Sequence, residues 1–560
     1  MRRLPALALV LTAACAPARG PAPSAPRPVP GAPAATVPAV PDMPDTPGAP
    51  SSPAAAAGAL APDWHLRDRA ADGVVGTSTT RALRELLAGV APKRTVVVAV
   101  IDGGVDTAHA ALRGALWSDP REQPNGADDD RDGLVDDVRG WNFIGGAGGR
   151  SVDHERLELT RLAAACRKGQ PAPAIASVGA TCPQLVARLD SAQQENAAQL
   201  AQLTSIASAV DASVRTLATA LGVPADSVTP ARVRALNPAT AEVRQARERY
   251  QYIIAAGATP AELRTALEEL QGRAKYELNP TFDPRPIVGD SVAGRSWGNG
   301  DVTGPDAGHG THVAGIIAAL AAPADSGMRG IVPAGLVRIM SVRAVPNGDE
   351  RDKDVAAAIR YAADHGAQII NMSFGKAYSP QKPAVDSAVR YAESRGVLLV
   401  HAAGNDASDN DVVGSYPTPT FLDGGRATTW IEVGASGPRA ERLAARFSNF
   451  GARTVDVFAP GSDIYSTLPG GTYGRQSGTS MAAPVVTGVA ALLMAYFPSL
   501  GAADVKRILL TSAVRFPDAR VARPGGTDAV PFASLSSTGG VVNAYTAVRM
   551  AQQEAAPRAQ

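Results

Sequence analysis

Large apolar residues gather in short, uninterrupted runs at four places along the chain. The runs lie at Thr95–Ile101, Leu336–Val342, Ala367–Met372 and Gly396–His401. A short apolar run without polar alternation is typical of a strand buried on both faces of a parallel sheet. Helices are expected between the runs, at about 310–321, 352–365 and 380–395. Because strands and helices alternate, the pattern predicts an α/β fold, with a mostly parallel sheet covered by helices on both faces.

A different pattern occupies the segment from about 150 to 280, which is polar, rich in alanine and helical in period. Its apolar seam consists of Leu203, Ile206, Val210, Val214, Leu217 and Leu221. Spacing by threes and fours predicts amphipathic helices packed as a hairpin or a small bundle. The helices are expected near 183–221, 239–256 and 260–276. We therefore assign a helical insert to 151–282, within an α/β domain that starts at 63–150 and continues over 283–550, before a tail at 551–560.

The first residues have the pattern of an export signal. Two arginines precede an apolar run at Leu4–Ala14, which is too short to span a bilayer as a mature helix. The small residues that end in Cys15 resemble a bacterial lipobox, in which the cysteine carries lipid and becomes the new N-terminus. We expect a signal peptide over 1–15 and an envelope lipoprotein. Ala16 does not suggest retention in the inner membrane, so the outer membrane is the expected location; a plain secretory signal is the alternative.

Residues 16–62 are rich in Pro, Ala and Ser and contain few large apolar side chains. Such a segment cannot bury a core and is expected to be a disordered, extended linker. It would suit a tether between a lipid anchor and a folded body, or it could be a tail without a role. Folded sequence is expected to start near Trp64.

Composition narrows the choice of partners. The formal net charge of the 560 residues is +1, so no excess of charge points to nucleic acid. Three cysteines exclude a disulfide-rich scaffold. Cys166 and Cys182 both lie in the helical insert, and in an exported protein we expect them to pair, which would stabilise the fold by about 3 kcal/mol. Two free thiols are the alternative. No pattern in the sequence indicates an oligomeric state.

Chemistry-bearing residues stand at the ends of the predicted elements. Asp102 follows the first strand, and Asn405 follows the fourth. Sites in parallel sheets form at these carboxyl ends. Ser480 precedes an apolar helical run, where free N–H groups favour negative charge. A serine nucleophile needs a base, which His309 can supply, and the base needs a carboxylate to fix its tautomer. The Asn405 amide and the Ser480 N–H could stabilise an oxyanion.

Each of these residues alone is a weak signal, but their local sequences together resemble the subtilase family, the subtilisin-like serine peptidases. The four matching blocks are Val100–Asp106, His309–Gly315, Ala402–Asn405 and Gly478–Pro484. The resemblance covers about 93–145 and 285–550, and includes Asn371–Gly375, Val455–Gly461 and Gly540–Tyr545. It implies a subtilisin-like three-layer α/β fold. It also implies a serine endopeptidase acting through an acyl-enzyme, with protein or peptide substrates.

The resemblance also suggests a substrate pocket. In the family, the strand at Asn371–Gly375 pairs with the substrate backbone. The residues expected to line the first specificity pocket are Ser373, Phe374, Gly375, Ala402 to Gly404, and Ser415 at its base. A small residue at the base would suit a sizeable apolar side chain.

Histidine spacing bears on the choice between catalysis and metal binding. His309 and His312 are separated by Gly-Thr, whereas the zincin pattern places two histidines four residues apart with a glutamate between them. We therefore interpret His309 as the base and His312 as a residue that packs behind the site.

Departures from the family pattern concern the aspartate block and calcium. Gly103 stands where a hydroxyl residue is usual, and Ala111 stands where many relatives have a calcium-binding Asp. A nearby acidic stretch could compensate, because Asp128, Asp130 and Asp132 match the start of an EF-hand-type loop. The match fails at its twelfth position, which is Arg139 instead of Glu. The chemistry requires no cofactor; a structural Ca²⁺ at these aspartates is one expectation and a solvated acidic turn is the other.

Two functional classes remain open at this point. One is an active serine endopeptidase of the cell envelope, and the other is a catalytically silent subtilase fold that serves as a binding module. The insert could block the cleft, bind a partner or decorate the surface. A lipase is disfavoured because Ser480 lies in Gly-Thr-Ser-Met-Ala instead of the Gly-x-Ser-x-Gly elbow. Trp64–Pro92 is too short for an inhibitory propeptide, so we expect a permanent extension.

Overall fold

The computed structural model describes residues 60–170, 178–289, 298–321 and 327–555. The predicted signal peptide at 1–15 with Cys15, nearly all of the linker at 16–62 and the end of the tail lie outside the described residues. The chain divides into two compact units. One joins Ala61–Ala207 to Leu263–Gln560, and the other contains Ser208–Glu262. The boundary therefore falls inside the segment expected to be a helical insert.

The larger unit is built on an eight-stranded sheet, with the strand order β2-β1-β3-β4-β5-β6-β12-β9. Its strands are β1 (Val96–Asp102), β2 (Val337–Arg343), β3 (Ile369–Met372), β4 (Leu398–Ala402), β5 (Trp430–Ser436), β6 (Val457–Pro460), β9 (Val514–Arg515) and β12 (Gly540–Val541). All neighbours are parallel except β12 and β9. The four predicted strands are β1 to β4, so the mostly parallel sheet is confirmed. Two antiparallel hairpins lie outside it, β7 (Ile464–Leu468) with β8 (Thr472–Gln476) and β10 (Arg520–Ala522) with β11 (Ala529–Pro531).

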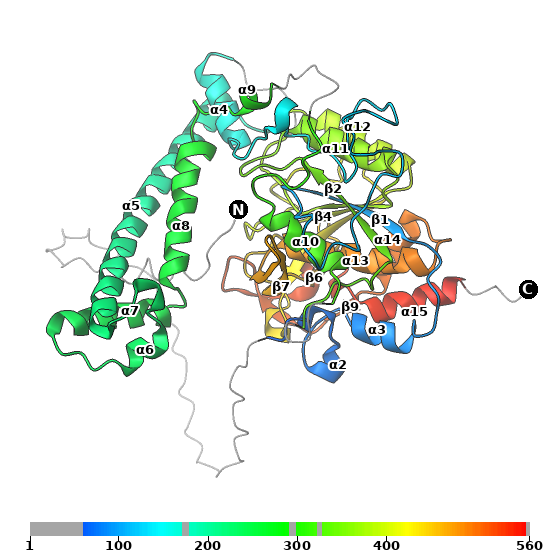
Figure 1. The fold of residues 1–560 in the computed structure, drawn as a ribbon. Coiled ribbons are helices and arrows are strands. Elements are labelled where there is room, and N and C mark those ends of the chain that lie inside the picture. Colours follow the sequence, from blue (N-terminus) through cyan, green and yellow to red (C-terminus); the bar gives the residue numbers. More distant parts are fainter. Residues whose placement is uncertain (1–59, 171–177, 290–297, 322–326, 556–560) are drawn as a thin grey trace, which may run out of the picture. The chain divides into compact units, whose positions relative to one another are not determined.

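Helices cover both faces of this sheet (Figure 1). On one face, α11 (Asp352–Asp364) and α12 (Lys382–Ser394) share a core with the β1 side chains Ala99 and Ile101. On the other face lie α10 (Gly308–Ala318), α13 (Thr479–Tyr496), α14 (Ala502–Thr511) and α15 (Ala544–Ala555). The fold is the three-layer α/β arrangement that the sequence predicts.

Helix α13 runs through the centre of the domain. Among the described residues it is the one helix whose length and composition would allow it to cross a membrane, but 89% of its apolar stretch is buried inside the domain. Continuous burial explains the apolar sequence, because a helix surrounded by protein needs no polar face. We interpret α13 as a core helix.

The N-terminal extension packs into the larger unit through η1 (Trp64–Leu66), α2 (Arg69–Asp72) and α3 (Thr79–Glu85). Trp64 is fully buried and donates from Nε1 to the carbonyl of Asp463. Farther along, Asn543 donates to the Ser78 hydroxyl, and Arg81 lies over the ring of Tyr545. These contacts make the extension part of the domain core.

The segment predicted as an insert is helical. Its helices are α4 (Glu158–Arg167), α5 (Cys182–Leu221), α6 (Pro230–Ala235), α7 (Ala241–Ala255) and α8 (Pro260–Gly272), with a π-helical turn, η4 (Arg273–Glu277), after α8. The short helix α9 (Arg285–Val288) follows the segment. Short 3-10 turns are η2 (Ala147–Gly149), η3 (Ala225–Ser227), η5 (Ala440–Arg442) and η6 (Phe532–Ser534). The three helices expected from the apolar seam are α5, α7 and α8, and their bounds agree to within a few residues.

Burial follows the predicted seam of α5. Leu203, Val210, Val214 and Leu217 are buried, whereas Ile206 and Leu221 are half-buried. At the start of α5, Cys182 forms a disulfide with Cys166 of α4. The disulfide joins the first helix of the insert to the longest one.

Candidate active site

Asp102 and His309 meet at the carboxyl edge of the sheet. Asp102 is the last residue of β1, and His309 lies in the first turn of α10. His309 donates from Nδ1 to both oxygens of the Asp102 carboxylate, at 2.9 and 3.0 Å. The Asp102 side chain is only 4% exposed, whereas the imidazole of His309 is 36% exposed. The carboxylate therefore fixes one ring nitrogen and leaves Nε2 open toward solvent.

Ser480 lies in the first turn of α13, which begins at Thr479, several residues before the apolar run that predicted the helix. Its hydroxyl donates to the carbonyl of Ser373 at 3.1 Å. Among the described residues no hydrogen bond joins Ser480 Oγ to His309. The structure thus places the candidate nucleophile against Ser373, in the segment Asn371–Gly375 that the sequence analysis assigned to substrate binding.

Pro484 makes possible a second hydrogen bond between Ser480 and Ser373. A proline inside a helix lacks the N–H that would bond to the carbonyl four residues earlier. In α13 that carbonyl belongs to Ser480, and it accepts a hydrogen bond from the Ser373 hydroxyl at 2.9 Å instead. A residue that would weaken most helices here frees an acceptor for the pocket segment.

A buried hydrogen-bond chain continues from this contact into the core. Thr487, about two turns beyond Ser480 along α13, donates to Asn371 Oδ1, and Asn371 Nδ2 donates to Ser373 Oγ. Both side chains are fully buried. The helix that carries Ser480 and the strand β3 that leads to Ser373 are thereby fixed to each other by side chains as well as by packing.

Asn405 stands just past β4, beside the N-terminus of α13. Its Oδ1 accepts hydrogen bonds from the Thr479 backbone N–H at 2.8 Å and from the Thr479 hydroxyl at 3.1 Å. Both acceptor bonds fix the orientation of the amide plane. Because the oxygen faces α13, the Nδ2 donor group is turned away from these bonds, and it makes no hydrogen bond among the described residues.

Asn449 clamps the loop that carries Asn405, and sequence reasoning missed it. Its Nδ2 donates to the Ala403 carbonyl, its Oδ1 accepts from the Asp406 and Ser408 N–H groups, and its backbone N–H donates to Gly404. Gly404 has φ +108°, and a Cβ there would lie 2.4 Å from Asn449 Nδ2. The glycine is required by both its backbone conformation and this close approach.

Three of the predicted pocket residues meet in space. A Cβ added at Gly375 would lie 3.2 Å from Ser415 Oγ, and one added at Gly404 would lie 3.7 Å from the same atom. The backbones of Lys376 and Tyr416 are joined by two hydrogen bonds of 2.9 Å, which hold Ser415 against the Gly375 segment. Ala402, at the end of β4, is buried.

A second histidine–carboxylate pair lies beneath the pocket. His401 of β4 faces Glu432 of β5, with Nδ1 3.0 and 3.1 Å from the carboxylate oxygens. Its Nε2 donates to the carbonyl of Phe374 at 2.9 Å. Trp430 also donates to Glu432. Both histidine nitrogens are therefore used, and the pair fixes the carbonyl of a pocket residue from below.

Lys376 connects the pocket segment to the first helix of the insert. Its buried Nζ lies 2.9 Å from Glu158 of α4 and 2.8 Å from Asp352 of α11, and it donates to the Glu350 carbonyl. Burial alone would raise the pKa of Glu158, but Arg161 and Lys376 outweigh it and lower that pKa to about 2. The start of the insert is thus fastened to the residue that follows the pocket.

His312 occupies a different environment from His309 although the two are one turn apart. It is fully buried, and its Nε2 donates to the carbonyls of Ile464 and Gly474. Burial lowers its pKa to about 3. Nε2 donates to two carbonyls and therefore offers no lone pair, and His312 is packed behind the site as the sequence analysis expects.

Gly103 fits a crowded loop behind Asp102. Its N–H donates to Asp102 Oδ1 at 2.7 Å, and its carbonyl accepts from Arg343 Nε. A Cβ at this position would lie 3.2 Å from the Val345 carbonyl. Arg343 also bonds to Asn142 and to Val152. The buried guanidinium supports the aspartate loop through the backbone, a role that sequence reasoning missed.

The acidic stretch folds back on its own backbone. Asp128 accepts from the N–H groups of Asp132 and Gly133, and Asp132 accepts from that of Leu134. Arg139, which replaces the glutamate of an EF-hand loop, donates to the carbonyl of Trp117. The three predicted aspartates do not form one group by themselves: Asp128 and Asp130 gather with Glu122, and Asp130 and Asp132 gather with His365.

Comparison with known proteins gives three related results. The model of the subtilase family matches residues 93–539. A thermophilic serine proteinase of Bacillus sp. (strain AK1) is 41% identical over 216 residues, which cover 38% of this chain and 48% of that protein. Subtilisin DY of Bacillus licheniformis is 35% identical over 231 residues, covering 40% of this chain and 78% of that protein. A crystal structure of a cold adapted subtilisin-like serine proteinase matches at 31% identity, with a TM-score of 0.34, over 43% of this chain and 77% of that one.

Proposed function

This chain belongs to the subtilase family of peptidases, and from that premise we propose that it is a serine endopeptidase. Peptide bonds are hydrolysed through a triad of Asp102, His309 and Ser480. The observation that carries the proposal is the pairing of His309 Nδ1 with the buried carboxylate of Asp102 at 2.9 Å, with the rest of the imidazole exposed. A histidine held in this way presents a basic nitrogen to an arriving nucleophile.

The first chemical step is attack by Ser480 on a peptide carbonyl. The serine hydroxyl leaves its bond to the Ser373 carbonyl and gives its proton to His309 Nε2. Asp102 then stabilises the positive imidazole through Nδ1–H. Catalytic hydrogen bonds are often long or misdirected without substrate and tighten in the complex, so the bond between Ser480 and Ser373 is compatible with this role.

The oxyanion of the tetrahedral intermediate lies between two donors. One is the Ser480 backbone N–H at the start of α13, where the helix dipole favours negative charge. The other is Nδ2 of Asn405, whose amide orientation is fixed by Thr479. His309 next protonates the leaving amine, and water then hydrolyses the acyl-enzyme with His309 again acting as the base.

We place the first specificity pocket at Ser373, Phe374, Gly375, Ala402, Gly404 and Ser415. The close approach of Ser415 to two glycines supports this placement. A pocket with a small polar base and glycine walls suits a sizeable apolar side chain. A panel of peptide substrates that differ at the residue before the scissile bond tests this, and a preference for charged side chains would contradict it.

The proposal includes export and a lipid anchor at Cys15. The disulfide between Cys166 and Cys182 supports an oxidising compartment. In cells fed an alkyne analogue of palmitate, the wild-type chain should take up label and Cys15→Ser should not. Equal labelling of both chains would rule out the anchor.

The catalytic proposal is tested by labelling with a fluorophosphonate probe, alongside hydrolysis of casein. Wild type should be labelled and active, Ser480→Ala should lose both properties, and Ser477→Ala should retain both. Ser477 is a suitable control because it is an exposed serine just before the same helix. A folded wild type without label would favour the alternative, a silent subtilase fold that serves as a binding module.

A further inference from the structure

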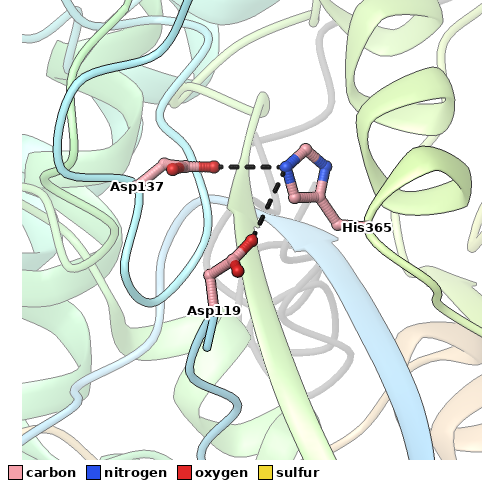
Figure 2. Close-up of side chains that lie close together, drawn as sticks. All are labelled: Asp119, Asp137 and His365. Carbon is pink, nitrogen blue, oxygen red and sulfur yellow. Dashed lines mark ion pairs between the residues drawn. The ribbon is translucent and has the colours of Figure 1, made fainter. Parts of the chain in front are cut away.

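The most unusual group of side chains outside the active site surrounds His365, the residue that follows α11. Three carboxylates face its ring, those of Asp119, Asp132 and Asp137, and we refer to these four residues as the His365 cluster. Figure 2 shows Asp119 and Asp137 directed at the same ring nitrogen. The aspartates come from the loop after β1, and the histidine comes from the end of a helix far away in sequence.

Distances within the His365 cluster are short and centre on one atom. Nε2 of His365 lies 3.1 Å from Asp132 Oδ2, 3.5 Å from Asp137 Oδ2 and 3.8 Å from Asp119 Oδ2. The histidine side chain is 6% exposed, and Asp119 and Asp137 are buried more deeply still. Placing the two buried carboxylates of Asp119 and Asp137 side by side is unfavourable unless a cation compensates them.

Polar atoms at the centre of the His365 cluster lack hydrogen bonds. Within the described residues, Nε2 of His365 and Oδ1 of Asp137 are both buried without a hydrogen-bond partner. A protonated Nε2 would direct its hydrogen at one carboxylate, yet none of its three contacts has hydrogen-bond geometry. Buried atoms of this kind require an explanation, and an ion is one of the few available.

The other ring nitrogen fixes the tautomer. His365 Nδ1 donates to the backbone carbonyl of Tyr361 at 2.9 Å, so in the neutral ring the lone pair lies on Nε2 and faces the carboxylates. The Tyr361 ring stacks on the imidazole at 4.0 Å between centroids, and Trp117 meets it edge-on at 6.1 Å. An imidazole that donates one N–H to a carbonyl and directs the other nitrogen at a cluster of carboxylates has the orientation of a metal ligand.

The carboxylates are also oriented by outer partners. The Tyr361 hydroxyl donates to Asp137 Oδ2 at 2.6 Å, and Arg121 forms two bonds to Asp119. These outer partners hold the carboxylates of Asp137 and Asp119 in the orientations that face the imidazole.

We propose that the His365 cluster is a binding site for one divalent transition-metal ion of the zinc class. In a tetrahedral site with bonds of about 2.0–2.1 Å, neighbouring ligand atoms lie roughly 3.3 Å apart. Asp119, Asp137 and His365 have ligand atoms that all lie within 4.8 Å of one another, so these three side chains form the ligand set. Their carboxylate oxygens lie 3.8 and 3.5 Å from Nε2 of His365, close to the tetrahedral value. Asp132 lies beside this set, in a second group with Asp130 and His365.

Nitrogen ligation distinguishes this site from the calcium expected in the same loop. Ca²⁺ takes six to eight oxygen ligands, whereas imidazole suits zinc and its neighbours. The all-oxygen group in this loop is a separate one, made of Glu122, Asp128 and Asp130. A calcium ion there and a zinc-class ion at His365 would be different sites with different side chains.

The role of such an ion is structural. Three buried protein ligands fill three positions of a tetrahedral site, and a water molecule would take the fourth. The ion would tie the loop from Asp119 to Asp137 to the C-terminal end of α11, which is one of the helices packed on β1 and β2. Removing it should loosen this loop and leave the residues of the triad in place.

The test uses the full chain carrying Ser480→Ala, which prevents self-digestion. After treatment with a chelator, Co²⁺ is titrated and its visible absorption is recorded, and Zn²⁺ is then used to displace it. One Co²⁺ per chain is expected, with the intense bands of a tetrahedral site, together with a higher melting temperature in Zn²⁺ than in chelator.

Variants identify the ligands. His365→Gln should weaken Co²⁺ binding at least about 100-fold, and Tyr361→Phe, which removes an outer partner, about 10-fold to 100-fold. Asp128→Asn, the matched control in the same loop, should bind as the parent does. If His365→Gln does not fold by circular dichroism, Asp119→Asn makes the same test. Absence of Co²⁺ binding, or binding that survives loss of His365 or Asp119, would overturn the proposal; so would stabilisation by Ca²⁺ alone that disappears in Asp128→Asn.

Discussion

Two histidine–carboxylate pairs lie on the same sheet, one at the end of β1 and the other on β4 and β5, and only their Nδ1 contacts are alike. His309 approaches Asp102 with Nδ1 at 2.9 Å, and His401 approaches Glu432 with Nδ1 at 3.0 Å. The imidazole of His309 is 36% exposed, whereas that of His401 is fully buried. The second nitrogen of His401 bonds to the Phe374 carbonyl, and the second nitrogen of His309 bonds to no described residue.

Under the proposed mechanism, a carboxylate partner does not by itself make a histidine catalytic. Both carboxylates orient an imidazole and stabilise its proton on Nδ1. What separates the two residues is the use of Nε2. In His401 it holds a pocket carbonyl in position, which is a structural task, and in His309 it remains available to accept a proton.

The largest effect is expected from a substitution in the pair of Asp102 and His309, whose Nε2 remains available. His309→Ala should lower kcat by about 10⁶, which is the size of the loss known for subtilisin itself, because no other base can activate Ser480. Hydrolysis of a peptide substrate by purified, folded variants measures this. His401→Ala is the matched control, and it should retain far more activity than His309→Ala. Equal losses in the two variants would mean that His309 is not the base.

The second prediction concerns Asn405, the proposed side-chain donor to the oxyanion. Asn405→Ala should lower kcat by about 10²–10³, again the value known for subtilisin, with KM almost unchanged, because Nδ2 bonds the oxyanion and not the bound substrate. Steady-state kinetics with one peptide substrate separates the two parameters. A loss confined to KM would assign Asn405 to substrate binding instead.

Much of this site could be predicted because its residues lie in local motifs. Asp102 ends an apolar strand and Ser480 begins an apolar helix, so their positions at the ends of predicted elements were enough to identify them as candidates. The limits of the helices in the insert followed from the period of their apolar seam. The helix was recognised from its apolar part, with Ser480 at its N-terminal end, and α13 begins at Thr479 although Pro484 and small residues fill its first turns.

Residues that act through distant partners could not be found in this way. Asn449 clamps the Asn405 loop, Arg343 supports the Gly103 carbonyl, and Glu432 pairs with His401. None of them stands in a motif, and each is meaningful only once the sheet has brought its partner close. The His365 cluster shows the same limit, since aspartates in a loop become a site only when a helix end far along the chain adds a nitrogen.

A third prediction concerns the buried pair of His401 and Glu432. Glu432→Gln should lower the free energy of unfolding by about 3 kcal/mol, because it leaves His401 buried without its carboxylate. Urea denaturation measures this change. The exposed pair of Arg507 and Glu554, 2.6 Å apart, provides the control, and Glu554→Gln should change stability by less than about 1 kcal/mol. Similar effects in the two variants would show that burial does not distinguish them. KM should also rise in Glu432→Gln, since the Phe374 carbonyl loses a fixed donor.

The smallest expected effect sharpens the comparison with a histidine that has no partner at either nitrogen. His65 in η1 is buried, both of its ring nitrogens lack hydrogen bonds within the described residues, and burial lowers its pKa to about 4. An unfolded histidine titrates near 6.5, so below that pH the unfolded chain binds a proton that the folded chain does not. The contribution of neutral His65 to the free energy of unfolding is therefore fully present above about pH 6.5 and is lost as the pH falls toward 4.

His65→Leu removes the titrating group and should remove that loss. Between pH 7 and pH 5.5 the variant should gain about 1 kcal/mol in unfolding free energy relative to the parent. The quantity to measure is the difference between the two urea curves at each pH, since other carboxyl and imidazole groups titrate equally in both proteins. A difference that does not change with pH would mean that His65 binds its proton equally in the folded and unfolded chains. Burial alone would then not be enough to lower the pKa of a histidine.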